Sequence, residues 1–173
     1  MTRPDMPIAN HQPRVVLVTG GAGFMYAASF SCVLRVFDWR VSGSHFVLML
    51  AQRYPDYKVI NLDKLDYCSS LRTLEPLAGA VNYEFVRGNI TSVDLVSFIM
   101  RSKNVDTVVH FAAQSHVDLS FDSSLDFTAD NALGTNVLLH CARMHGVKRF
   151  VHISTDEVYG TNTDGVRTAS PHC

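Results

Sequence analysis

The chain has 173 residues, of which 47% are hydrophobic and 18% are charged, a composition typical of a folded domain and not of a disordered segment. Its net charge of -1 argues against a general nucleic-acid-binding surface, and no apolar run reaches the length of a membrane span. The four cysteines contain no C-x-x-C pair, so neither a disulfide framework nor a zinc site is indicated. We therefore expect a soluble, cytoplasmic protein without nucleic-acid or membrane partners.

Residues 14–24 are the stretch around which the rest of the chain is organised. They follow a leader, residues 1–13, that reads as flexible, and they form a run of β-branched and leucyl residues that stops at a glycine cluster. Glycines directly after a buried strand allow a ligand to approach the backbone, whose free N–H groups attract a pyrophosphate. Gly20 and Gly23 fill the first two places of a G-x-x-G-x-x-G spacing, but Tyr26 occupies the third. An ordinary tight turn is the alternative interpretation.

Two helix candidates follow this strand, although a crossover between parallel strands normally needs only one. Residues 25–41 have the composition of a short buried helix that ends at a Ser-Gly pair. Residues 44–54 open with a capping serine and carry a strongly apolar helical body. The extra segment, residues 26–42, therefore looks inserted.

The remainder of the chain alternates between strand and helix patterns. The expected strands are 58–63, 82–88, 106–113 and 148–154, and the expected helices are 92–102 and 125–145. This alternation predicts an α/β fold with a doubly wound parallel sheet, the Rossmann fold, in the strand order 3-2-1-4-5. A ligand would bind beyond the carboxyl ends of the first and fourth strands.

Asp63 ends the second expected strand. An acid at this position can accept hydrogen bonds from both ribose hydroxyls of an adenosine, and its charge would repel a 2′-phosphate, which favours NAD over NADP. A solvated loop or helix-capping acid is the alternative interpretation.

The richest polar cluster follows the fifth strand, at residues 154–160. Asp156 and Glu157 are adjacent there, and unequal environments would let one carboxyl act as an acid while the other acts as a base. A pair of exposed loop acids is the alternative, but the glycine turn and Asp63 lie at matching strand ends, which favours a site.

The histidines do not predict a metal site. His110 and His116 flank a pair of alanines, and His140 and His145 are five residues apart, whereas a spacing of four brings two ligands onto one helix face. His152 alternates with apolar neighbours, and we expect a partly buried strand residue with a hydrogen-bond partner.

Four segments of the chain resemble the extended short-chain dehydrogenase/reductase superfamily and, within it, the dTDP-glucose 4,6-dehydratases. These segments are residues 19–24, 61–67, 110–118 and 154–160. The resemblance covers residues 14–160 except the suspected insertion, and its most discriminating part is the Thr-Asp-Glu triplet after Ser154. It implies NAD-dependent dehydration of dTDP-glucose to dTDP-4-keto-6-deoxyglucose, with hydride taken from the sugar C4 and returned to C6, and a homodimer built through the long helix.

The resemblance also implies roles for individual residues. Asp156 would protonate the departing hydroxyl, Glu157 would be the base at C5, and Thr155 would hydrogen-bond the sugar C4 oxygen. The cofactor-binding residues would be Gly20, Gly23 and Phe24 at the pyrophosphate, Asp63 at the ribose, Ala112 and Ala113 along the cofactor, and Ser154 at the nicotinamide. Family members usually have an acid in the place of Asn89, at the adenine amino group; the amide oxygen of Asn89 can still accept that hydrogen bond.

The chain departs from the family pattern in two further ways. Removal of residues 26–42 brings Gly43 into the place of the missing third glycine, which supports an insertion. The superfamily's catalytic Tyr-x-x-x-Lys is absent, because no lysine follows Lys148, and residues 161–173 form an atypical tail. We therefore expect an NAD-binding Rossmann domain over residues 14–160, a missing C-terminal substrate domain, and little or no dehydratase activity. A catalytically silent NAD-binding module, and a dehydratase or epimerase of another sugar nucleotide, are the alternatives.

Overall fold

The computed structural model describes residues 11–23, 43–66, 69–114 and 124–154. Its elements in chain order are β1 (Val15–Thr19), α1 (Gly43–Arg53), β2 (Lys58–Asp63), the 3-10 helix η1 (Arg72–Leu77), β3 (Tyr83–Arg87), α2 (Val93–Ser102), β4 (Thr107–His110), α4 (Ser124–Thr128), the π-helix η2 (Ala129–Gly134), α5 (Thr135–Met144) and β5 (Arg149–His152).

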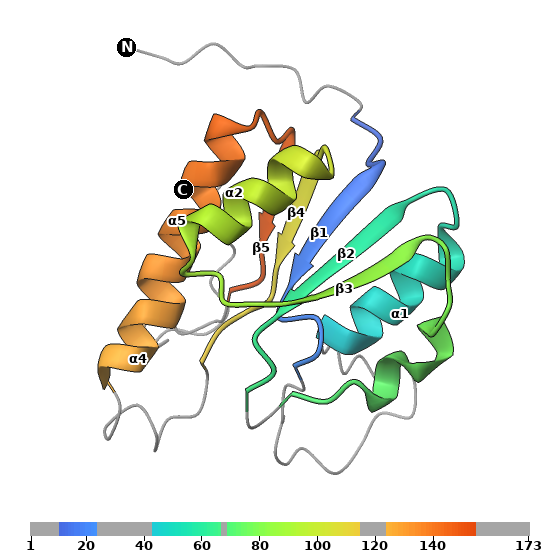
Figure 1. Ribbon diagram of the computed structural model, residues 1–173, viewed down its shortest axis with the longest axis horizontal. Coiled ribbons are helices and arrows are strands. Elements are labelled where there is room, and N and C mark those ends of the chain that lie inside the picture. The colour runs from blue at the N-terminus through green and yellow to red at the C-terminus, as the bar shows by residue number, and fades with distance from the viewer. Residues whose placement is uncertain (1–10, 24–42, 67–68, 115–123, 155–173) are drawn as a thin grey trace, which may run out of the picture.

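The strands form one parallel sheet in the order β3-β2-β1-β4-β5, as Figure 1 shows. The central strand β1 pairs Leu17 with Ile60 of β2 on one side and with Val108 of β4 on the other. Because all five strands run in the same direction, their carboxyl ends meet at one edge of the sheet. The expected fold class and strand order are confirmed.

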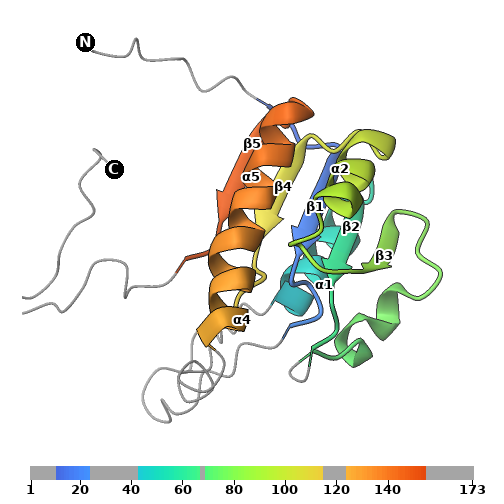
Figure 2. The same ribbon diagram turned by 60° about the vertical axis from the view of Figure 1, so that its left-hand side comes forward.

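Helices cover the two faces of the sheet, and alternate residues of β1 enter the two cores. Leu17 packs with residues of α2 and α5 on one face, whereas Val16 and Val18 pack with residues of α1 and η1 on the other. Figure 2 shows α2 and α5 on one side of the sheet and α1 on the opposite side. The near-continuous apolar strands are explained by this double coverage.

Several boundaries differ from those expected. The strand expected over 106–113 ends at His110, since the residues after it leave the sheet and line a cleft. The helix expected over 125–145 consists of α4, η2 and α5, with a π-turn in the middle. The hydroxyl of Ser92 accepts a hydrogen bond from the Leu95 N–H, which is why α2 begins where the capping pattern predicted. The helix expected over 25–41 lies outside the described residues.

Candidate functional site

A cleft lies at the carboxyl ends of β1, β2, β3 and β4, and it encloses about 780 Å³ of open space. Its lining residues come from every one of these strand ends and from α1 and η2: Gly20, Gly23, Gly43, Leu62, Asp63, Lys64, Asp66, Ser69, Gly88, Asn89, Ile90, Phe111, Ala112, Ala113, Gln114 and Asp130. This is the position at which the strand order reverses direction, where ligands of open α/β sheets bind.

The glycine turn after β1 leaves no room for side chains. Gly20 has a φ of 72°, a conformation that favours glycine, and its Cα faces the backbone of Ala112 in the β4 extension. Gly43, the first residue of α1, lies so close to the carbonyl oxygen of Gly20 that a Cβ on Gly43 would overlap it. Gly43 therefore fills, in space, the place of close helix–strand packing that the third glycine of a dinucleotide fingerprint occupies.

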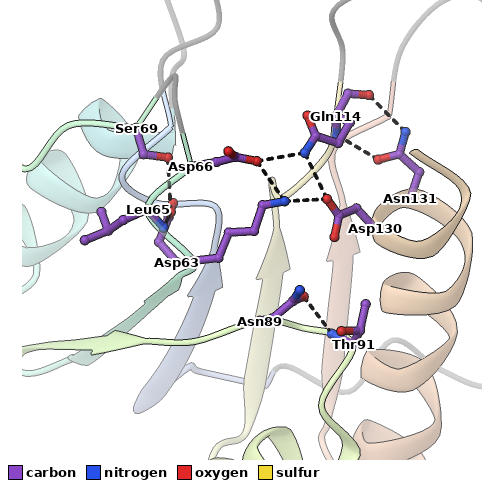
Figure 3. Close-up of polar contacts among 10 residues, drawn as sticks. Asp63, Leu65, Asp66, Ser69, Asn89, Thr91, Gln114, Asp130 and Asn131 are labelled. Atoms are coloured by element: carbon purple, nitrogen blue, oxygen red, sulfur yellow. Dashed lines mark hydrogen bonds and ion pairs between the residues drawn. The ribbon is translucent and has the colours of Figure 1, made fainter. Parts of the chain in front are cut away.

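Asp63 joins the end of β2 to the glycine turn. Its side chain is only 6% exposed, and its Oδ2 accepts a hydrogen bond from the Ala22 N–H at 2.9 Å. Its Oδ1 accepts from the Leu65 N–H at 2.8 Å and from the Ser69 hydroxyl at 3.1 Å, as Figure 3 shows. The carboxylate is therefore held in one orientation at the floor of the cleft by three donors.

A second polar cluster, here called the polar bridge, consists of Lys64, Asp66, Gln114 and Asp130. The ammonium of Lys64 lies 2.6 Å from Asp130 Oδ2 and 2.8 Å from Asp66 Oδ2. The Gln114 amide nitrogen donates to the same two carboxylates, at 2.9 Å each. The bridge thus connects the segment after β2 with the segment after β4 and with η2, as Figure 3 shows.

The polar bridge fixes the charge on Lys64. Desolvation by itself would lower the pKa of the Lys64 ammonium, but hydrogen bonds and charge attraction from Asp130 and Asp66 outweigh it and raise this pKa above the ordinary value. No sequence motif pointed to this cluster, because Lys64 and Asp130 are far apart along the chain. The only sequence signal was an acid, Asp130, on a helix position that turns out to be buried.

The π-turn places Asn131 against the backbone of Gln114. The Asn131 Oδ1 accepts from the Gln114 N–H at 2.7 Å, and the Asn131 Nδ2 donates to the Gln114 carbonyl at 2.9 Å. This pair of bonds satisfies the backbone of a segment that has left the sheet. The wider turn is what lets consecutive residues Asp130 and Asn131 both meet Gln114, and π-turns of this kind are frequent at functional sites.

His110 is fully buried behind the cleft and connects three elements. Its Nε2 lies 2.9 Å from the hydroxyl of Thr135, which itself donates to the Asn131 carbonyl, so this hydroxyl must accept from His110. Its Nδ1 then accepts from the Thr19 hydroxyl at 2.7 Å. Burial, with a smaller contribution from the nearby His152, lowers the pKa of His110 to about 4, so the ring is neutral.

The expectation for His152 is wrong on burial. The side chain is exposed, and its ring lies 5.0 Å from that of His110 in a tilted arrangement. The reason is that β5 is the last strand of the sheet among the described residues, so its neighbour covers it on one side only.

The cleft gathers most of the residues expected to hold a cofactor. Those that line it are Gly20, Gly23, Asp63, Asn89, Ala112 and Ala113. Ser154 is described and exposed but is not among the lining residues. Phe24 and the triplet Thr155, Asp156 and Glu157 lie outside the described residues, as does the suspected insertion. In the described part of the chain, no group of three metal-ligating side chains converges, and no helix is long and apolar enough to cross a membrane.

Comparisons with known proteins agree with the fold and the cleft. Residues 41–170 match the family described as GDP-mannose 4,6 dehydratase. The chain is 45% identical over 149 residues to a mouse dTDP-D-glucose 4,6-dehydratase, a match that spans 86% of this chain and 37% of the mouse protein. It is 44% identical over 154 residues to a trifunctional UDP-glucose 4,6-dehydratase of Arabidopsis thaliana, across 88% of this chain and 21% of that protein.

A solved structure is also similar. A dTDP-glucose 4,6-dehydratase of Streptomyces venezuelae, crystallised with NAD bound, superposes with a TM-score of 0.71 and 42% identity, over 87% of this chain and 42% of that one. The resemblance to dTDP-glucose 4,6-dehydratases is thereby confirmed as a similarity, although the chain spans well under half the length of these relatives. By the match over most of its length, the chain belongs to the GDP-mannose 4,6-dehydratase family.

Proposed function

We propose that the cleft binds NAD+ and that the chain carries the cofactor half of an NAD-dependent dehydratase acting on dTDP-glucose. The observation that carries the proposal is the buried carboxylate of Asp63, locked to the glycine turn through the Ala22 N–H. A dinucleotide needs an anion-binding turn and a ribose acceptor a few ångströms apart, and this pair provides both. The NAD complexes among similar solved structures support the choice of cofactor.

The cleft residues divide along the length of the proposed cofactor. The Gly20–Gly23 turn and the first turn of α1 would hold the pyrophosphate, where backbone N–H groups and the helix dipole favour negative charge. Asp63 would accept from the adenosine ribose, and Ala112 and Ala113 would follow the chain of the cofactor toward the nicotinamide, near Ser154. A 2′-phosphate would meet the Asp63 carboxylate, so NAD+ is preferred over NADP+.

NAD+, when bound, supplies hydride acceptance from the sugar C4 and hydride return to C6. The chain's own residues would move the protons. Asp156 would protonate the departing C6 hydroxyl, Glu157 would remove the C5 proton, and Thr155 would hydrogen-bond the C4 oxygen. Such proton transfers each contribute roughly 10²- to 10⁴-fold to a rate. Residues carried over from the resemblance support these roles, and dimerisation through the long helix is part of the same proposal.

A catalytically silent NAD-binding module is the second candidate. The observation in its favour is that no lysine follows Lys148, so the Tyr-x-x-x-Lys pair that activates the sugar C4 hydroxyl is absent from this sequence. The two candidates differ in turnover. Incubation of the chain with NAD+ and dTDP-glucose yields the 4-keto-6-deoxy sugar only under the first, and UDP-glucose as a parallel substrate tests the choice of nucleotide.

The deciding experiment is calorimetric titration of the full chain with NAD+ and with NADP+, beside the same chain without residues 26–42. We expect both forms to bind NAD+ and neither to bind NADP+ as tightly. Binding by the shortened chain alone would mean that residues 26–42 obstruct the pyrophosphate turn. Absence of NAD+ binding by both forms would overturn the proposal.

A further inference from the structure

The orientation of the Asn89 side chain is set by its own turn. The Thr91 N–H donates to Asn89 Oδ1 at 3.0 Å, in the turn that follows β3. Because a backbone N–H can only donate, the atom it contacts must be the amide oxygen and not the amide nitrogen. This is the local side chain to backbone bond that asparagine commonly makes two residues ahead of itself.

The amide nitrogen of Asn89 is consequently left for a ligand. Asn89 lines the same cleft as Asp63, and Figure 3 shows its oxygen joined to Thr91 while the amide lies beneath Asp130 of the polar bridge. Within the described ranges, no protein acceptor is recorded for the Asn89 Nδ2, and the residue is exposed. Asn89 thus presents an N–H donor, rather than an acceptor, to whatever occupies this end of the cleft.

The occupant of this end follows from the path of a dinucleotide. With the pyrophosphate on the turn after β1 and the ribose at the end of β2, the base reaches the end of β3, where Gly88, Asn89 and Ile90 line the cleft. A purine is attached to its ribose through N9, so its opposite edge, which carries N1 and the substituent on C6, points away from Asp63. Asn89 lies on that side of the cleft.

We propose that Asn89 is a base-selectivity residue, whose amide N–H favours a purine with an oxygen on C6 over one with an amino group there. The inference rests on the proposed NAD+ site. An oxygen on C6 accepts from the Asn89 Nδ2, whereas the amino group of adenine meets a second donor. To accept from adenine, the amide would have to share its oxygen or turn over and abandon the Thr91 N–H. An acid at the same position keeps one oxygen for Thr91 and offers the other to the amino group.

The test compares two dinucleotides in wild-type and variant chains. Dissociation constants for NAD+ and for nicotinamide hypoxanthine dinucleotide are measured by calorimetry on the full chain and on Asn89→Asp. We expect the ratio of the NAD+ constant to the hypoxanthine constant to fall roughly three- to tenfold in Asn89→Asp, the size of one hydrogen bond. The added charge repels both cofactors equally, so it cancels in the ratio.

Asn104→Asp is the matched control, because it makes the same change on an exposed residue that precedes β4, at the opposite edge of the sheet. Its ratio should equal that of the wild type. An unchanged ratio in Asn89→Asp, with NAD+ still bound, would overturn the role of Asn89 and leave the cofactor site standing. Failure of the wild-type chain to bind either dinucleotide would overturn both proposals.

Discussion

At Asp63, one carboxylate accepts hydrogen bonds from Ala22, Leu65 and Ser69, and it is almost fully buried. The Asp63→Asn variant keeps one oxygen but turns an N–H toward one of these donors. We expect a loss of about 1–3 kcal/mol in the free energy of unfolding, as for a buried group left without a partner, and at least tenfold weaker NAD+ binding. Urea denaturation and calorimetry measure the two effects.

The control for this variant is Asp56→Asn, an identical charge change on an exposed residue between α1 and β2. It should leave both quantities unchanged. Wild-type stability in Asp63→Asn would show that the carboxylate is not needed to hold the glycine turn.

His110 gives the fold a dependence on acid. Its pKa is about 4 in the folded chain, below the ordinary value of 6.5, so the unfolded chain binds the proton more readily. The stabilisation is therefore complete above pH 6.5 and is lost as the pH falls toward 4, by about 3 kcal/mol at most. Urea denaturation at pH 7 and pH 4.5 should show a smaller decrease for His110→Gln than for the wild type. Equal decreases in the two chains would contradict this origin.

Among the elements, the polar bridge holds the end of β2 to η2. The Asp130→Asn variant removes one of the two carboxylates around Lys64, and the Lys64→Met variant removes the ammonium. Since Lys64 is partly exposed and solvent screens its charge, we expect each variant to lose only about 1 kcal/mol of unfolding free energy. The double variant should lose less than the sum, because the two residues share one interaction. Additive losses would mean that the bridge contributes no coupling.

Elements with a local signal could be predicted from the sequence. The strand over residues 58–63 was predicted with its observed bounds, because a buried apolar run ends there at an acid. The capping serine likewise located the start of α2. The π-turn was not predictable, since it depends on contacts of Asp130 and Asn131 with Gln114, which only the folded chain brings together. The same reason hid the polar bridge and the turn that orients the Asn89 amide.

In the whole molecule, the described helices leave apolar side chains exposed on the outer side of α4, η2 and α5, among them Leu125, Leu133 and Leu139. If the proposed dimer forms through this long helix, Leu133→Glu should shift the chain toward the monomer in sedimentation equilibrium, because a buried unpaired charge is costly. Leu71→Glu, on an exposed leucine just before η1, is the control and should not change the assembly state. Equal behaviour of the two variants would contradict a helix-mediated dimer.

The contact between Gly43 and the Gly20 carbonyl has a consequence for how the fold tolerates change in length. It brings the start of α1 against the turn after β1, so the chain between them leaves and returns at nearly the same point. The entropy of closing such a loop grows only with the logarithm of its length, and a doubling costs about 0.6 kcal/mol. The interval from Gly23 to Gly43 is therefore a place where evolution or an engineer can lengthen this protein, or insert a reporter domain, while the sheet and its register stay as they are.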